Sequence, residues 1–582
     1  MVTGPRAIGR AHKSSRRLRY SCLASTMTSP ARPPTPRPAA TLVIVRDGER
    51  GMEVLLMHRT KAMDFAGGAH VFPGGAVDVA DAALAASCAG LDDAHASRRL
   101  EIASGGLAYW VCAIRECFEE AGLLYAYAGE ELVHFDSPVA REDAPSLRRA
   151  LNAGERTFAA MIEALGLRLA TDRLAYLSHW ITQAGRPRRY DTRFFIAAAP
   201  EHQRPMHDEG ETVAHEWIRP RVALERHARG EMQLMFPTMK TLELLATFGR
   251  VSDALDYAHT PRAMPPMSPR LASGRDGPKL LVPGDYAYAE VGKLDPEGKG
   301  TAAYEILPGV PVRIAPRIVR LTAPNPGVMT GPGTNTYLLG DAASGIAVID
   351  PGPAIDAHIQ AIVDAAAAPI RWILCTHTHI DHSPGAAPLA ARTGAPVLGM
   401  RARYPERQDA TFAPTCELAH GARLEVGGCR LRVLHTPGHA SNQLCFLEEA
   451  ERLLFTGDHL MQGSTVVINP PDGDMAVYLA SLRLLLDEAI EFIAPGHGFL
   501  MGKPHEMVER VLVHRVAREN KVLAALAAHG PATLEDLVPQ VYDDVPARMH
   551  PVASRSLLAH LIKLRDEGRA AEAGRRWVVP GS

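Results

Sequence analysis

Metal-binding side chains are concentrated in residues 375–385, whose sequence is CTHTHIDHSPG. The apolar residues WILC just before them predict a strand, so this segment forms the loop at its end. His377 and His379 then point to the same side, because side chains alternate along an extended chain, and Asp381 and His382 follow where the chain turns. Imidazole and carboxylate are ligands that zinc binds at about 2.0–2.2 Å. The spacing predicts a metal site.

One zinc ion needs about four ligands, so further ligands are expected downstream. Three residues have the right context: His439 in HTPGHAS, Asp458 in LFTGDHL and His497 in IAPGHGF. Each follows an apolar, strand-like segment and a glycine, which places it on a loop at the rim of a sheet, where functional residues collect. His435 and His459 neighbour these ligands and are expected either to support the ligands from outside the site or to be packing residues.

Together these residues resemble the metallo-β-lactamase superfamily, whose pattern is HxHxDH followed by Gly-His, Gly-Asp and a late Gly-His. The resemblance covers residues 305–515 and implies a four-layer αββα sandwich around two zinc ions, with iron or manganese as alternatives. It implies that His377, His379 and His439 bind the first metal, that Asp381, His382 and His497 bind the second, and that Asp458 bridges them. It further implies metal-assisted hydrolysis in which Asp381 orients the nucleophile.

Two flanking segments, residues 323–340 and 456–482, resemble the lactamase-β-2-like branch, whose members carry a C-terminal winged helix. Residues 516–582 fit that module. Members of the superfamily cleave thioesters or lactams, and one animal mitochondrial member of the branch cleaves single-stranded RNA. The module holds nine Lys or Arg against eight Asp or Glu, although Arg548, Arg555, Lys563, Arg575 and Arg576 could still form a cluster. Nucleic acid is therefore a less favoured partner than a small molecule.

A second chemistry is suggested by AIRECFEEAGLL, residues 113–124. Glu116, Glu119 and Glu120 are spaced i, i+3 and i+4, which places three carboxylates on one face of a helix. Like charges at this spacing repel one another, and a divalent cation would relieve the repulsion. Oxygen ligands of this kind suit Mg²⁺ held together with substrate phosphates. The alternative is a solvated acidic face without catalytic function.

The segment from Arg115 to Leu123, RECFEEAGL, resembles the second half of the nudix box. The first half is displaced: Gly74-Gly75 close HVFPGG, Asp81 stands where the family has glutamate, and about 25 extra residues separate the halves. This arrangement resembles the peroxisomal coenzyme A diphosphatases, with Asp64 in place of an arginine of their coenzyme A signature. The resemblance implies a nudix α/β/α sandwich, Mg²⁺ or Mn²⁺ on the three glutamates, and Arg115 bracing them.

The chain is expected to be a multidomain α/β protein. Residues 1–40 are expected to be a disordered or mis-called extension: residues 1–26 either precede the true start at Met27, which is the favoured interpretation, or form an organelle transit segment. A nudix domain follows at 41–292, a linker at 293–304, a metallo-β-lactamase domain at 305–515 and a winged helix at 516–582. Strands are expected at 41–48 and 52–59 around a turn with Asp47-Gly48, and the apolar residues 279–291 are expected to close the nudix domain.

Composition agrees with a globular enzyme. The 582 residues carry a net charge of −2 and 46% hydrophobic residues, and the eight cysteines form no CxxC pair. The scattered cysteines are typical of reduced, mostly buried thiols and predict a cytoplasmic protein. No apolar run is long enough for a membrane span, so no membrane partner is expected. The sequence indicates no oligomeric state. The expected function is a two-site hydrolase acting on an ester, thioester or phosphodiester at the zinc site and on a nucleoside diphosphate derivative, such as coenzyme A, at the nudix site. The alternative is RNA cleavage at the zinc site, with the nudix domain as a nucleotide sensor.

Overall fold

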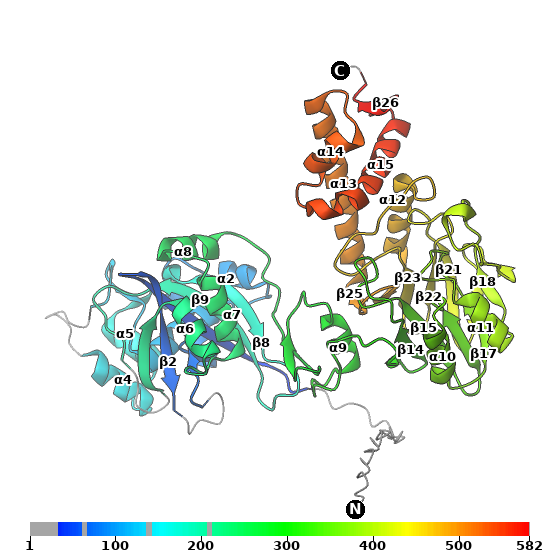
Figure 1. Cartoon of the computed structure of the whole chain (residues 1–582). Helices are drawn as coiled ribbons and strands as arrows, with labels where there is room; N and C mark the ends of the chain where they lie inside the picture. Colours follow the sequence, from blue (N-terminus) through cyan, green and yellow to red (C-terminus); the bar gives the residue numbers. More distant parts are fainter. Residues whose placement is uncertain (1–32, 61–66, 135–142, 207–211, 581–582) are drawn as a thin grey trace, which may run out of the picture.

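The computed structural model describes residues 33–60, 67–134, 143–206 and 212–580. It confirms a multidomain α/β protein: an N-terminal sandwich, a second sandwich and a C-terminal helical module follow one another along the chain (Figure 1). No helix in the described part of the chain combines the length and apolar character needed to cross a bilayer.

The N-terminal domain is built on one mixed sheet with the strand order β10-β2-β1-β9-β8. Its main strands are β1 (Arg37–Gly48), β2 (Gly51–Arg59), β8 (Ala175–Ile181), β9 (Tyr190–Ala198) and β10 (Thr212–Ile218). The short strands β3 (His70–Val71) and β4 (Gly74–Ala76) pair with β2 and β1. A small separate sheet contains β5 (Ala126–Ala128), β6 (Glu131–Leu132) and β7 (Arg168–Leu169).

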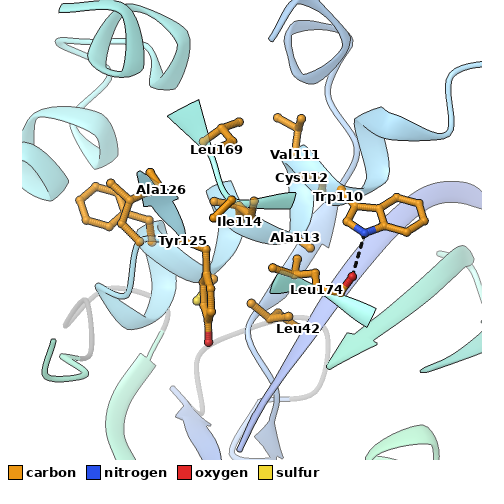
Figure 2. Close-up of a cluster of buried hydrophobic side chains, with 14 of the residues drawn as sticks. Leu42, Trp110, Val111, Cys112, Ala113, Ile114, Tyr125, Ala126, Leu169 and Leu174 are labelled. Carbon is orange, nitrogen blue, oxygen red and sulfur yellow. Dashed lines mark hydrogen bonds between the residues drawn. The ribbon is translucent and has the colours of Figure 1, made fainter. Parts of the chain in front are cut away.

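Helices cover both faces of this sheet, which gives the α/β/α sandwich. One face carries α1 (Val79–Ala83), α2 (Asp93–Leu100), α3 (Leu107–Ala121), α4 (Ala144–Asn152) and α5 (Phe158–Leu165). The other carries α6 (Pro220–Ala228), α7 (Phe236–Leu245) and α8 (Val251–His259). Figure 2 shows α3 in the first core. Trp110 packs against Phe195, with ring centroids 4.5 Å apart, and its indole N–H donates a 3.1 Å hydrogen bond to the carbonyl of Leu174. Helix α3 is therefore fixed against the sheet.

Strand β1 begins earlier than the sequence suggests. Residues 37–40 were expected to belong to the unstructured extension, but Arg37 pairs with Tyr190 of β9 and Ala39 with Ala76 of β4. That expectation is wrong for these residues, because neighbouring strands on both sides offer backbone partners that the Pro-rich sequence does not reveal. The turn between β1 and β2 is also displaced: Gly48 pairs with Gly51, so the turn falls just after Asp47-Gly48. Residues 1–32 lie outside the described residues.

The second domain contains two sheets. The first has the order β13-β14-β15-β16-β17-β18-β19. Its strands are β13 (Val312–Ala315), β14 (Ile318–Thr322), β15 (Asn335–Asp341), β16 (Gly345–Ile349), β17 (Ile370–Leu374), β18 (Val397–Gly399) and β19 (Cys416–Glu417). The second sheet contains β20 (Arg423–Val426), β21 (Cys429–His435), β22 (Leu444–Glu448), β23 (Leu453–Gly457), β24 (Phe492–Pro495) and β25 (Met501–Gly502).

Three cores separate four layers in this domain, which confirms the αββα sandwich. The two sheets pack face to face around Tyr337, Phe446 and Phe455. Helices α10 (Asp356–Ala365) and α11 (Ala386–Thr393) cover the outer face of the first sheet. Helices α12 (Met475–Leu484) and α13 (Pro504–His529) cover the outer face of the second.

The segment between the two sandwiches packs against the second one. Hairpin β11 (Arg270–Ala272) and β12 (Lys279–Leu281), together with α9 (Tyr288–Leu294), surrounds Phe499 of the second domain. Glu290 on α9 forms a buried, bidentate ion pair with Arg320 of β14 and accepts a 2.8 Å hydrogen bond from the backbone of Leu500. The expectation that residues 279–291 close the nudix domain is therefore wrong, because their apolar and charged partners lie in the sandwich that follows.

The expected linker at 293–304 is a compact turn rather than an open connection. The carboxylate of Asp295 accepts hydrogen bonds from the backbone N–H groups of Lys299, Gly300 and Thr301 at 3.0, 2.6 and 3.0 Å. Asp295 is itself buried. This carboxylate fixes the direction of the chain between α9 and β13.

The C-terminal module has the elements of a winged helix. It contains the end of α13, α14 (Leu534–Val541), α15 (His550–Asp566) and the predicted terminal hairpin of β26 (Ala571–Ala573) and β27 (Arg576–Val578). Its core surrounds Trp577. The expected boundary at residue 515 falls inside α13, since this helix is continuous from the second sandwich into the module.

Candidate metal centre and carboxylate site

Four loops bring the seven predicted metal ligands together. His377, His379, Asp381 and His382 follow β17 of the first sheet. The other three follow strands of the second sheet: His439 after β21, Asp458 after β23 and His497 after β24. The site therefore lies where the ends of the two packed sheets meet, and it needs both sheets to exist.

The ligand atoms form three overlapping groups, each with its atoms within 4.8 Å of one another: His377, His379 and His439; His377, His382 and Asp458; and Asp381, His382 and His497. In the first group, Nδ1 of His379 lies 3.0 Å from Nε2 of both His377 and His439. In the third, Nε2 of His497 lies 3.3 Å from Asp381 and 3.2 Å from Asp458. The carboxylate of Asp458 lies between the histidines of the first and third groups, as a bridging ligand would.

Several of these atoms are buried without a hydrogen-bond partner among the described residues: Nε2 of His382, Nε2 of His497 and Oδ1 of Asp458. Buried polar atoms are normally satisfied, so such a convergence fits a site for divalent cations. Burial also lowers the pKa of His377, and it lowers that of His379 to about 3. Both imidazoles are therefore neutral, which is the form that binds a metal.

Asp381 and Asp458 place negative charge next to His382 and His497. Burial alone would lower the pKa of His382 and His497, but the negative charges of Asp381 and Asp458 outweigh it. They raise the pKa of His382 and raise that of His497 to about 9. The two aspartates thus create a negative potential that attracts cations to the position between the imidazoles. The residues present suit a dinuclear metal site.

The remaining ring nitrogens of the histidines are held by neighbouring groups. Nδ1 of His439 lies 2.8 Å from the carbonyl of Val467, and Nδ1 of His497 lies 3.2 Å from the carbonyl of Gly333. Nδ1 of His382 lies 2.9 Å from Asp350. Such contacts fix the tautomer and orientation of a metal-binding histidine.

Asp350 is a functional residue that the sequence analysis missed. Its carboxylate also accepts hydrogen bonds from the backbone N–H and the hydroxyl of Thr376, both at 2.7 Å. Asp350 has a φ angle of 50°, in the left-handed region that few residues other than glycine adopt. The only signal in the sequence is its place in VIDPG at the end of an apolar strand. The conformation aims its carboxylate at both His382 and the start of the metal-binding loop.

The positions directly before two of the ligands have no room for a side chain, so only glycine fits there. A Cβ atom on Gly496 would lie 2.7 Å from both Asp458 Oδ1 and His382 Cε1. A Cβ atom on Gly457 would lie 2.3 Å from the hydroxyl of Thr376, and its φ angle is 48°. The Gly-Asp and Gly-His pairs therefore allow the strands to approach the cluster closely.

A cavity of about 430 Å³ opens beside the cluster. His379, Asp381, His439 and Asp458 form its floor. Its walls are largely apolar or neutral, and one residue comes from the C-terminal module: Met329, Thr330, Ile380, Gln408, Met461, Val467, Asn469, Pro470, Pro471, Asp472 and Arg555. This is the size of a small-molecule binding site. Sequence reasoning had considered Arg555 only as part of a basic cluster.

Helix α3 carries the second predicted site. Arg115 donates to Asp81 through both Nε and Nη2, at 2.8 and 3.0 Å, and through Nη1 to Glu116 at 2.7 Å and Glu119 at 3.1 Å. Glu120 is buried and accepts a 3.0 Å hydrogen bond from the backbone of Gly74. The two displaced halves of the motif are therefore adjacent in space.

The site on α3 differs from the first in its electrostatics. Burial raises the pKa of Glu116 to about 7, against the opposing charge of Arg115. Within the described residues the three glutamates form no group as tight as the histidine cluster, and Arg115 occupies the space between two of them. Asp81, which stands where the family has glutamate, accepts hydrogen bonds from Nε and Nη2 of Arg115 and so orients its guanidinium group. Asp64, the other departure from the family pattern, lies outside the described residues.

Three protein families match parts of the chain. The metallo-beta-lactamase superfamily matches residues 329–497, the beta-lactamase associated winged helix domain matches 533–577, and the NUDT19 Nudix domain matches 87–245. The first range contains all seven side chains of the metal cluster, and the third contains the four charged residues of α3.

Individual proteins are similar to parts of the chain. The beta-lactamase-like protein 2 homolog of Drosophila melanogaster is 32% identical over 285 residues, which are 45% of this chain and 92% of that protein. The atrochrysone carboxyl ACP thioesterase of Aspergillus chevalieri is 31% identical over 286 residues, covering 46% of this chain and 89% of that protein. Among solved structures, a NUDIX hydrolase from Alicyclobacillus acidocaldarius aligns with 31% identity and a TM-score of 0.33, over 38% of this chain and 96% of that chain.

Proposed function

Because this chain belongs to the metallo-β-lactamase superfamily, with a NUDT19-type Nudix domain and a winged helix fused to it, we propose that its histidine and aspartate cluster hydrolyses a thioester. The observation that carries the proposal is the cavity beside the cluster. It offers an apolar wall for an acyl chain directly above side chains that suit two metals. The sequence similarity of this chain to proteins named as thioesterases supports the same chemistry.

The proposed ligands are those given by the family pattern, and zinc is the proposed metal because imidazole-rich sites suit it. Bound divalent cations would supply a nucleophilic water at neutral pH and polarise the thioester carbonyl. The chain's own residues position the reactants. Asp381 accepts a 3.3 Å hydrogen bond from the hydroxyl of Thr334, which holds its carboxylate in place to orient the attacking water. Water adds to the carbonyl carbon, the carbon–sulfur bond breaks, and a carboxylic acid and a free thiol leave.

A panel of acyl thioesters tests this function. Release of free thiol by the zinc-loaded protein is the measurement, and the Asp458→Ala variant is expected to lose it, because Asp458 lies between the two ligand groups. Equal thiol release by wild type and Asp458→Ala would show that the cluster does not carry the reaction.

A second activity is proposed for the N-terminal domain, supported by the family match and by the pairing of Arg115 with Glu116 and Glu119. Mg²⁺ or Mn²⁺ on Glu116, Glu119 and Glu120 would assist hydrolysis of a nucleoside diphosphate derivative, with coenzyme A or an acyl-coenzyme A as the candidate substrate. The Glu119→Gln variant is expected to stop release of the phosphopantetheine product. Binding of coenzyme A without any turnover by wild type would instead identify a sensor domain.

RNA cleavage is a weaker candidate for the metal site. Several cations of the winged helix are engaged in ion pairs within the module, including Arg518 with Asp544 and Lys563 with Glu519. A nucleic-acid module needs free cations along one face. Cleavage of labelled single-stranded RNA by wild type, absent in Asp458→Ala, would favour this alternative. If RNA is not cleaved, the proposed partner is a small-molecule substrate, and neither a membrane nor nucleic acid. The proposed location is the cytoplasm.

A further inference from the structure

The winged helix contributes a wall to the metal-site cavity. Arg555 near the start of α15 lines the cavity together with His379, His439 and Asp458. Among the residues that the structure describes, it is the one Lys or Arg in the lining. Its side chain is exposed, and no ion pair or hydrogen bond to another described residue involves it. Arg555 is therefore a cation that lines the cavity and has no partner in the part of the chain that the structure describes.

The position of Arg555 relative to the metal ligands is fixed by the chain between residues 461 and 472. Val467 in this segment accepts from Nδ1 of His439, and the next residue, Ile468, donates its backbone N–H to the hydroxyl of Ser556 at 3.2 Å. Arg515 of α13 donates to the carbonyl of Val466. Ser556 is the neighbour of Arg555. The backbone at Arg555 is thus tied to the segment that orients His439, and both residues line the cavity.

Apolar side chains at the mouth of the cavity are exposed to an unusual degree. Ile380, between the metal ligands His379 and Asp381, is 75% exposed, and Met329 on the facing loop is 46% exposed. Contact of large apolar side chains with water is unfavourable, and burial against an apolar surface relieves it. They suit an apolar portion of a ligand that covers them.

Nucleic acid would need a different lining. Single-stranded RNA is held by several cations along its backbone and by aromatic side chains on which its bases stack. Within the described residues the cavity offers a single cation and no Phe, Tyr or Trp. Other cations of the module are held in ion pairs, as Arg565 is with Asp566 and Glu572. The lining fits a small ligand that combines an apolar chain with one anionic group.

We propose that Arg555 binds an anionic oxygen group, a carboxylate or a phosphate, of the substrate, so that the winged helix selects anionic thioesters for the metal site. This inference rests on the proposed thioester hydrolysis. The guanidinium fork is suited to paired oxygens of a carboxylate or phosphate, and the bond gains strength from charge on both partners. Arg555 acts in binding and positioning, and it takes no part in bond breaking.

Three thioesters test the inference on the full-length, zinc-loaded protein. The first is a neutral apolar acyl ester of N-acetylcysteamine, the second carries a carboxylate at the end of the same acyl chain, and the third is the neutral acyl ester of 4′-phosphopantetheine. Arg555→Gln is expected to raise KM for at least one anionic thioester about tenfold, with kcat and the neutral thioester unchanged. The affected substrate shows whether the anion is on the acyl or the thiol side. Arg555→Lys should restore part of the affinity.

Arg548→Gln is the matched control, because Arg548 is an exposed arginine of the same module outside the cavity. It should leave all three KM values unchanged. Equal effects of Arg555→Gln on neutral and anionic thioesters, or no effect on either anionic one, would overturn the inference.

Binding separates this inference from the proposed hydrolysis. Non-hydrolysable thioether analogues of the three substrates can be titrated by calorimetry into wild type and Arg555→Gln. If wild type hydrolyses no thioester but binds an anionic analogue about tenfold more tightly than the variant does, the reaction is wrong and the anion site stands. Equal binding, or no binding by wild type, would remove the anion site whatever the activity.

Discussion

The carbonyl oxygen of Val467 lies 2.8 Å from Nδ1 of His439. This contact orients one of the proposed metal ligands through the backbone of a segment that is itself held from the other side. The N–H group of the following residue, Ile468, donates to Ser556 of the winged helix. Two consecutive residues therefore connect the metal cluster to a helix about 90 positions further along the chain.

The Ser556→Ala variant should weaken catalysis at the metal site. Loss of its hydroxyl leaves the buried N–H of Ile468 without its partner, which costs about 1–3 kcal/mol and lets the segment carrying Val467 shift. We expect kcat/KM for thioesters to fall while the fold is retained, as measured by initial rates and circular dichroism. The matched control is Ser554→Ala, since the hydroxyl of Ser554 donates only to Pro551 within the same helix. Equal rates for the two variants would contradict the connection.

Asp350→Asn should weaken metal binding. The carboxylate of Asp350 holds Nδ1 of His382 and the backbone N–H of Thr376, and loss of such a contact typically lowers metal affinity about tenfold to a hundredfold. Asparagine tolerates the left-handed backbone of this position, so the substitution removes the negative charge and keeps the backbone conformation. Competition with a chromophoric chelator measures the zinc affinity. Asp341→Asn, on the surface of the same domain, is the control. Unchanged affinity in both variants would show that Asp350 has no role in holding the ligand.

Glu290→Gln should destabilise the metallo-β-lactamase domain even though residue 290 precedes that domain in sequence. Glu290 and Arg320 are each 2% exposed and paired, and breaking a buried pair costs about 3–5 kcal/mol because one charge is left alone. Denaturant unfolding followed by protease digestion and mass spectrometry reports on each domain separately. Glu297→Gln, which breaks the ion pair with the exposed Lys299, should have no measurable effect. Destabilisation confined to the nudix domain would contradict the packing of α9.

His358 should make the metallo-β-lactamase domain less stable in mild acid. Burial lowers the pKa of His358 to about 4, below the value of about 6.5 for an unfolded chain. Between these values the unfolded state binds a proton that the folded state does not. The free energy of unfolding therefore falls as the pH falls through this window, by up to about 3 kcal/mol.

The His358→Gln variant isolates this contribution, because glutamine can keep a hydrogen bond with Thr336 but does not titrate. Denaturant unfolding of both proteins at about pH 7.5 and about pH 5 is the measurement. Wild type should lose more stability between the two conditions than the variant. An equal loss would mean that other groups cause the pH dependence.

The sequence was sufficient for chemistry that is local along the chain. HxHxDH after an apolar strand, and a glycine directly before His439, Asp458 and His497, predict that these side chains lie on sheet-end loops. The structure places them in one cluster. The same is true of the charged face of α3, where Arg115 and its glutamates are close in sequence.

Contacts between distant segments could not be predicted in this way. Nothing in VIDPG shows that Asp350 will accept from His382, and nothing around Arg555 shows that it will face a metal cluster. The error at residues 279–291 has the same origin. An apolar pattern predicts that a segment is buried, but Phe499 and Arg320, which bury this one, are identified only by the packing of the second sandwich.

The continuous helix α13 limits how the chain can be divided. It packs Val508 into the metallo-β-lactamase sandwich and Val522 and Leu526 into the winged helix, over 26 residues or about 39 Å. A truncation at residue 515 would cut α13 near its middle and expose apolar surface on both protein fragments. The two modules should therefore be inherited, expressed and engineered as a single unit, and swapping the winged helix between relatives to change substrate choice would require a splice outside α13.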